Sequence, residues 1–286
     1  MADQSHRMGI LLMLGATLAW STAGLFARAI PLDTPTVIFW RGMFGAAGLI
    51  GLLIAMKGLA GLRDFTRLGW AGAVYAFASG IGVLSFVGAL KSTTIAHVAI
   101  IYATVPFAAA ALGWLFLREK PSRAAIAAST AALIGAATMV GFGGDGALFG
   151  DALAVIMVLA MASLIVIARG NPDLPTLAAG ALSTIWAPLV SLPFATTAGL
   201  TAQNMALIAG FGLINSTLGF ALFIYGSRKL PPVETALLSA LETPMTPLWV
   251  WLVFGETPTM PTLIGGLTVL TAVLCYIHYE NRPNRP

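Results

Sequence analysis

The sequence predicts an all-α integral membrane protein of ten transmembrane helices, arranged as two inverted five-helix repeats. Of its 286 residues, 58% are hydrophobic and only 9% are charged, whereas soluble domains carry about 25% charged residues. So few charges cannot cover a soluble globule of this size, which excludes a water-soluble two-domain enzyme. Apolar runs long enough to cross a bilayer, which takes about 20 residues, fill most of the chain.

Ten such runs follow one another, separated by short linkers that often contain proline, glycine or aspartate. These residues end one helix and begin the next, and no linker is long enough to hold a soluble domain. The first run is too long for the core of a secretory signal, about 7–15 residues, so we expect it to remain as a span. The predicted spans cover residues 9–28, 35–56, 68–90, 95–117, 124–142, 151–168, 174–195, 204–225, 233–254 and 260–279.

The lysines and arginines between the spans predict an orientation. With the N-terminus in the cytoplasm, twelve of the 15 basic residues fall on the inner side and two, Arg28 and Lys91, on the outer side, while Arg41 lies inside a span. Inner loops of membrane proteins carry an excess of basic residues. The bias therefore predicts a multi-pass protein of the bacterial cytoplasmic membrane with both termini in the cytoplasm.

The placing of the basic residues also indicates that the net charge of +4 does not serve to bind nucleic acid. The basic residues sit in short loops rather than in one patch, so we expect no nucleic-acid partner. There is no Walker A loop and no paired-histidine motif, so neither direct ATP use nor a metal site is expected. Cys275 is the single cysteine, which excludes an intrachain disulfide. We expect no cofactor and no catalytic residues.

The two halves of the chain, residues 1–145 and 146–286, look alike. Span four ends in Trp114-Leu-Phe-Leu-Arg-Glu-Lys-Pro121 and span nine in Trp251-Leu-Val-Phe-Gly-Glu-Thr-Pro258, which aligns Glu119 with Glu256. Five spans is an odd number, so the second copy is upside down. The basic flanks of Glu119 are missing around Glu256, as expected for a loop that faces out. Inverted repeats are typical of transporters, although a duplication that only built a stable bundle would look the same.

These features resemble the EamA-type branch of the drug/metabolite transporter superfamily, and within it most closely the YddG-type exporters of aromatic and other amino acids. The resemblance covers almost the whole chain. It implies a basket of ten helices around a central cavity and export by alternating access. Its motifs are Leu18-Ala-Trp-Ser-Thr22, Trp40-Arg41, Leu241-Glu-Thr-Pro-Met245, Phe254-Gly-Glu256 and Gly265-Gly266.

Two charged residues inside the spans are candidates for function, because charge in hydrocarbon is costly. Glu242 lies about 13 Å into span nine. It either binds a substrate ammonium or a proton, or is a structural acid bonded to a neighbouring helix. Arg41, about 9 Å below the outer end of span two, either binds a carboxylate, extends outward to the membrane surface, or pairs with Asp33. Span seven has no arginine at the position that matches Arg41, so any role of Arg41 belongs to one half only.

Polar and aromatic residues in mid-span are the other candidates for substrate binding. They suit the wall of a cavity for amphipathic solutes, but small and polar residues also form packing seams and bridges between membrane helices. For gating or coupling we expect Arg41, His97, and the prolines at 106 and 244. Together with Glu242, the predicted substrate-binding residues are Trp20, Tyr75, Ser79, Tyr102, Asn215 and Ser216.

The sequence therefore predicts a secondary transporter that exports small metabolites, in the first place aromatic and other neutral amino acids, through a central cavity. The alternatives are a multidrug or other metabolite exporter of the same superfamily, or an intramembrane lipid-modifying enzyme. An enzyme of that kind would gather acids or histidines at one membrane face, and here they are scattered. The expected partners are an amphipathic small molecule and membrane lipid, with the chain as a monomer or homodimer.

Overall fold

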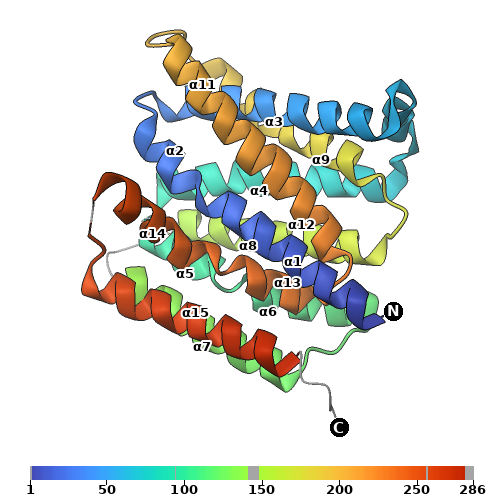
Figure 1. Ribbon diagram of the computed structural model, residues 1–286, viewed down its shortest axis with the longest axis vertical. Coiled ribbons are helices and arrows are strands. Elements are labelled where there is room, and N and C mark those ends of the chain that lie inside the picture. The colour runs from blue at the N-terminus through green and yellow to red at the C-terminus, as the bar shows by residue number, and fades with distance from the viewer. Residues whose placement is uncertain (1, 94, 141–147, 256, 281–286) are drawn as a thin grey trace.

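A computed structural model describes residues 2–93, 95–140, 148–255 and 257–280. Within these residues every regular element is a helix, and the helices lie side by side as one bundle (Figure 1). The start of α1 and the end of α15 lie at the same end of the bundle, which we call the terminal end. The helices are α1 (Ala2–Ser21), α2 (Ala23–Ala29), α3 (Thr34–Lys57), η1 (Leu59–Arg67), α4 (Gly69–Ser92), α5 (Ile95–Tyr102), α6 (Val105–Leu112), η2 (Gly113–Leu117), α7 (Arg123–Val140), α8 (Leu148–Gly170), α9 (Thr176–Thr184), α10 (Trp186–Ser191), η3 (Leu192–Phe194), α11 (Ala202–Phe211), η4 (Gly212–Gly219), α12 (Phe220–Ser227), α13 (Pro232–Ser239), α14 (Glu242–Phe254) and α15 (Met260–Glu280).

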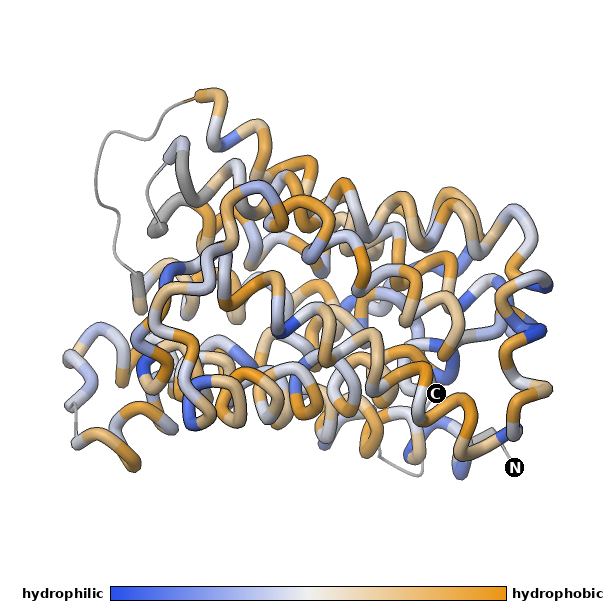
Figure 2. Tube along the Cα trace, turned by 90° about the horizontal axis from the view of Figure 1, so that it is seen from above, coloured by the Kyte–Doolittle hydropathy of each residue, from blue (hydrophilic) through white to orange (hydrophobic). Residues whose placement is uncertain are grey.

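Nine helical segments of the described chain are long and apolar enough to cross a membrane. They confirm nine of the ten predicted spans. The remaining prediction, residues 124–142, corresponds to α7, whose apolar stretch Arg123–Met139 is shorter. Hydrophobic residues follow the helices along their length (Figure 2). Residues Gly143–Gly146, which were predicted as a linker, and Glu256 lie outside the described residues, as do Arg282 and Arg285.

Four of the spans are broken into two helical pieces. In three of them the break lies just before a proline: Pro106 follows α5, Pro188 follows α9 and Pro244 follows α13. Proline has no N–H to donate to the carbonyl four residues earlier, and its ring clashes with that carbonyl. Both effects interrupt the helix before the proline. The break between α1 and α2 has no proline. There the Thr22 hydroxyl donates to the Ala19 carbonyl at 2.6 Å.

The spans pack side by side in a few large helix–helix contacts. The helix α8 contacts α4, α5 and α6, while α1 contacts η4, α12, α13 and α14. The helix α3 lies against α9, α10 and η4, and α7 lies against α15. The last pair is held by a close approach of two glycines, because a Cβ on Gly265 would lie 2.3 Å from the Gly135 carbonyl oxygen. Small residues of this kind let membrane helices approach closely.

Candidate functional site

The break between α1 and α2 is tied to η4 by the side chain of Asn215. Its amide nitrogen donates to the Ala19 carbonyl at 2.8 Å and to the Thr22 hydroxyl at 3.0 Å. The backbone carbonyl of Asn215 in turn accepts a 3.1 Å bond from the indole N–H of Trp20. The Trp20 ring also contacts Phe223, with centroids 5.1 Å apart. Asn215 and Trp20 therefore belong to one bonded cluster between the first and eighth spans.

The side chain of Arg41 enters the bundle next to this cluster. Its Nε donates to the Ser216 hydroxyl at 3.3 Å, and the guanidinium lies 4.6 Å above the centre of the Phe211 ring. A cation above an aromatic face is stabilised by the ring quadrupole, the more so away from water. The terminal nitrogens of Arg41 have no hydrogen-bond partner among the residues that the structure describes. The guanidinium is thus held in place with part of its donor capacity unused.

Asp33, the alternative partner considered for Arg41, has other contacts. Its carboxylate accepts from the Thr36 backbone N–H at 3.0 Å and from the Thr196 hydroxyl at 3.2 Å. This is the capping interaction of an acid at the first turn of a helix. The bonds from Thr36 lower the pKa of Asp33 below its usual value. Asp33 therefore caps α3 and joins it to the segment before α11.

Glu242 is the first residue of α14 and lies at the break that follows α13. In the described part of the chain its carboxylate accepts no hydrogen bond, although its backbone carbonyl accepts one from Thr246 at 2.9 Å. The next residue, Thr243, lines an interior cavity together with Tyr102 at the end of α5. Glu242 therefore lies beside an interior region that the fourth and ninth spans both border.

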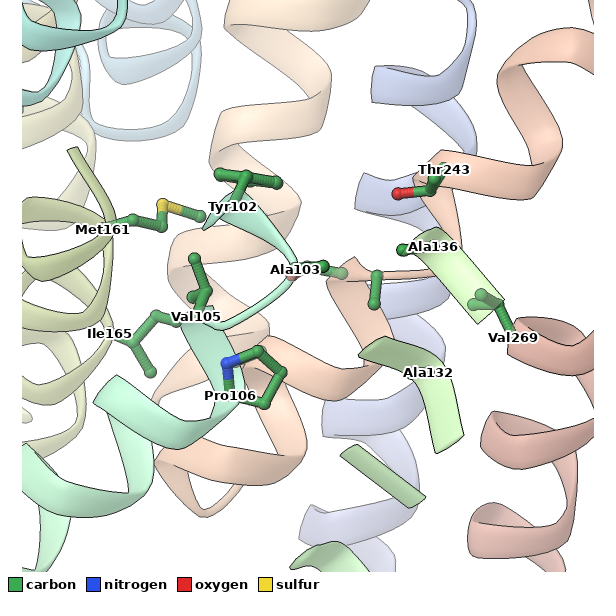
Figure 3. Close-up of a pocket in the computed structure, with 13 residues that line it drawn as sticks. Tyr102, Ala103, Val105, Pro106, Ala132, Ala136, Met161, Ile165, Thr243 and Val269 are labelled. Carbon is green, nitrogen blue, oxygen red and sulfur yellow. The ribbon is translucent and has the colours of Figure 1, made fainter. Parts of the chain in front are cut away.

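Tyr102 and Pro106 line a small cavity together with Met161 of α8, Thr243 of α14 and residues of α7, α13 and α15 (Figure 3). The cavity has a volume of about 20 Å³, enough for one water molecule. Binding sites for small molecules usually measure about 300–1,000 Å³. This cavity is therefore too small to hold a small-molecule substrate. A substrate bound next to Tyr102 requires the broken spans around it to move.

The remaining predicted residues lie elsewhere. Tyr75 is fully buried in α4, with its ring 6.4 Å from that of Phe220. Its hydroxyl has no partner in the described chain. Ser79 is buried one turn further along α4, and Pro244 is buried in α14. His97 is part of α5, but its side chain lies outside the described residues.

Trp249 was not identified from the sequence, although it takes part in the contacts around the candidate site. The indole N–H of Trp249 donates to the Ser21 hydroxyl at 2.8 Å, which fixes α14 to the last residue of α1. In the sequence, Trp249 could have been noticed only because it lies on the same predicted span as Glu242 and Pro247. One turn before the break, Thr17 donates to the Leu238 carbonyl at 3.2 Å. The helix α1 is thus bonded to the ninth span, which contains Glu242, on both sides of the break in that span.

Polar contacts close the terminal end of the bundle. His6 lies 3.0 Å from Glu234, a carboxylate only 1% exposed at the start of α13. Arg169, at the end of α8, reaches Glu119 at 3.1 Å and the Arg228 carbonyl at 2.7 Å. Arg228 in turn donates to the Leu174 carbonyl. These contacts join the ends of six spans, namely the first, fourth, sixth, seventh, eighth and ninth.

Together these features define a polytopic helical membrane protein with a polar, partly unsatisfied interior. The EamA-like transporter family matches residues 7–141 and again residues 148–277, so the chain belongs to this family of the drug/metabolite transporter superfamily. It is therefore a transporter, and the family does not consist of enzymes.

Individual relatives agree with this assignment. An uncharacterized transporter of Archaeoglobus fulgidus is 27% identical over 94% of this chain and 96% of its own length. A riboflavin transporter of Rhizobium johnstonii is 25% identical, over 97% of this chain and 93% of its own length. A solved crystal structure superposes with a TM-score of 0.83 at 17% identity, covering 96% of this chain and 99% of that one. At that identity it supports the fold alone.

Proposed function

We propose that the protein is a secondary transporter that exports amino acids, aromatic and other neutral ones, through a site between Arg41 and Glu242. The observation that carries this proposal is that the Arg41 guanidinium, held by Ser216 and Phe211, and the Glu242 carboxylate, at the break after α13, each have hydrogen-bonding groups without a partner among the described residues. Buried polar groups in proteins nearly always have partners, so unused ones mark a place where a ligand binds. A substrate carboxylate fits the guanidinium and a substrate ammonium fits the carboxylate.

The surroundings suit the rest of such a molecule. Phe211 lies under the Arg41 guanidinium, Trp20 bonds Asn215, and Tyr102 lines a cavity with Thr243. Aromatic rings bind apolar or aromatic side chains while their polar edges stay hydrogen-bonded. The YddG-type specificity is part of this proposal. A second candidate is riboflavin or a similar flat heterocycle, because a relative that covers nearly the whole chain is named a riboflavin transporter. Riboflavin lacks the zwitterion that would engage Arg41 and Glu242 together.

We further propose that the chain consists of ten spans in two inverted repeats that move by alternating access. Three observations support this. The family matches the chain twice in succession. The start of α1 and the end of α15 share one end of the bundle, as an even number of crossings requires. The helix packing also repeats. The third span (α4) lies against the sixth (α8), and the eighth span (α12), which matches the third, lies against the first (α1), which matches the sixth.

The excess of basic residues in alternate loops supports placing the terminal end of the bundle in the cytoplasm of a bacterium. The contacts between Arg169 and Glu119 and between His6 and Glu234 would then close the cytoplasmic side. Opening to the cytoplasm would break these contacts and bend the spans at Pro106 and Pro244, as in the rocking of other repeat-built transporters.

Counterflow in liposomes tests the proposed cargo. Proteoliposomes loaded with an unlabelled amino acid are diluted into a trace of the same labelled amino acid, across a panel that includes phenylalanine and alanine, with and without a pH gradient. We expect transient accumulation of aromatic and neutral amino acids, absent from protein-free liposomes. Accumulation of riboflavin alone would favour the second candidate. No accumulation of any amino acid in vesicles that transport another solute would refute the amino-acid proposal.

A further inference from the structure

A long apolar groove runs along the outside of the bundle between α4 and the broken span of α9 and α10, away from the polar interior. Its volume is about 590 Å³, and its wall is almost wholly apolar. The residues that shape it are Trp70, Phe77, Leu182, Ile185, Trp186 and Leu189. Trp70 is 83% exposed and Phe77 is 62% exposed, so the groove opens outwards along its length.

The break at Ile185 forms the groove. Beyond it, Pro188 packs so tightly on α3 that a Cβ on Gly42 would lie 2.3 Å from its ring. The Trp186 ring packs in the same way on Gly80 of α4. The second half of the span is thus fixed against α3 and α4, with Trp70, Ala73 and Phe77 of α4 exposed beside it. Trp70 marks the mouth of the groove, at the end of the bundle where α4 begins.

A basic segment lies directly before this mouth. The short helix η1 connects α3 to α4 and packs on both α3 and α9. Its one acid, Asp64, is paired with Lys57 at 2.7 Å. Arg63 and Arg67 are exposed, and the structure gives neither a partner among the described residues. Two free guanidinium groups therefore lie within seven residues of Trp70, next to exposed Leu59 and Leu62.

We propose that this region binds an anionic phospholipid of the membrane, with its phosphate at Arg63 and Arg67 and one acyl chain in the groove. An acyl chain matches a long, open, apolar wall that faces hydrocarbon, and guanidinium groups bind phosphate through paired N–H donors. Basic residues at a membrane surface each favour anionic lipid by about 1 kcal/mol. With the terminal end in the cytoplasm, the lipid belongs to the cytoplasmic leaflet. The site does not depend on what the protein transports.

Tryptophan quenching by brominated lipid tests the site in the reconstituted full-length protein. Dibrominated phosphatidylglycerol or dibrominated phosphatidylcholine is added to phosphatidylcholine vesicles, and the quenching is fitted to a relative binding constant. The wild-type protein is expected to prefer phosphatidylglycerol by about fivefold to thirtyfold, the range for one to two effective arginines. The Arg63→Gln/Arg67→Gln variant is expected to lose this preference. The Arg123→Gln variant, altered at an exposed arginine on α7, is expected to keep it.

Two further variants locate the acyl chain. Trp70→Phe removes the reporter at the mouth and is expected to lower the phosphatidylglycerol-specific quenching. Ala73→Trp fills the groove and is expected to weaken binding of both lipids there. The proposal is refuted if the double arginine variant keeps the wild-type preference, or if Trp70→Phe leaves the specific quenching unchanged. It is also refuted if the groove proves to be covered by a second copy of the chain, seen as a dimer that Ala73→Trp dissociates.

Discussion

The amide nitrogen of Asn215 donates to the carbonyl oxygen of Ala19 at 2.8 Å, three residues before the first span changes from α1 to α2. The carbonyl at this position is also bonded by the Thr22 hydroxyl. In hydrocarbon a broken helix is tolerated only where side chains satisfy the freed backbone groups. Asn215 therefore allows a break in mid-membrane without a proline.

Replacing Asn215 with leucine is expected to destabilise the protein more than it alters the substrate site. Side-chain hydrogen bonds between membrane helices contribute about 0.6–1.7 kcal/mol, and here two bonds are lost at once. The expected result is a lower unfolding midpoint in detergent. Asn204→Leu, at a half-buried asparagine near the start of α11 that bonds the Gly199 carbonyl, serves as control. A midpoint equal to that of the wild type would show that the break does not depend on Asn215.

Hydropathy predicted the spans well, because every backbone group in lipid must be bonded within its own helix and few other structures are possible. The prediction of residues 35–56 corresponds to α3, Thr34–Lys57, and that of residues 260–279 to α15, Met260–Glu280. The prolines at 106 and 244 also marked real breaks, since a missing N–H acts locally.

The contacts that define the candidate site could not be predicted in this way. The bond from Arg41 to Ser216 joins residues 175 apart in the chain, and that from Trp249 to Ser21 joins residues 228 apart. Periodicity within one helix holds no information on which neighbour a side chain meets. For the same reason Tyr75 was grouped with the other candidates, whereas its ring packs on Phe220.

Glu242→Gln is expected to lower the rate of phenylalanine counterflow by about tenfold to hundredfold, the range for one hydrogen bond to a charged group. Folded yield should change little, because the carboxylate bonds no described residue. N-acetylphenylalanine, which lacks the ammonium, should be transported equally well or equally poorly by both proteins. Asp173→Asn, at an exposed acid, is the control. An unchanged phenylalanine rate in Glu242→Gln would remove this residue from the site.

Arg41→Gln is expected to raise the KM for phenylalanine and to leave that for phenylalanine amide unaltered, because the amide has no carboxylate for the guanidinium. Arg41→Lys keeps the positive charge. It loses the several guanidinium N–H donors that can bond Ser216 and the substrate carboxylate at the same time. It should therefore fall between the wild type and Arg41→Gln. Equal changes in KM for phenylalanine and its amide would indicate that Arg41 only supports the structure around Phe211.

Two matched glycine substitutions test the packing of α7 on α15. Gly265→Ala places a Cβ 2.3 Å from the Gly135 carbonyl oxygen, whereas a Cβ at Gly51 on α3 meets nothing within 4 Å. Overpacking costs about 1–3 kcal/mol, and alanine in an open helical position gains up to about 1 kcal/mol over glycine. Gly265→Ala should lower the unfolding midpoint and Gly51→Ala should keep or raise it. Equal midpoints would mean that α7 and α15 do not pack this closely in the membrane.

The orientation can be tested at Lys120, an exposed residue of the loop between η2 and α7. Cys275 is exposed and is first replaced by serine, so that Lys120→Cys has the one thiol of the chain. If the terminal end of the bundle is cytoplasmic, a membrane-impermeant maleimide should label this thiol only after the cells are permeabilised. A cysteine at Thr197 should react in intact cells. This residue lies between η3 and α11, in the loop that joins the seventh and eighth spans, and the proposed orientation places that loop outside the cell. Labelling of position 120 in intact cells would place Glu119 and Arg169 on the outer side, so that their contact would close the outer side of the transporter instead.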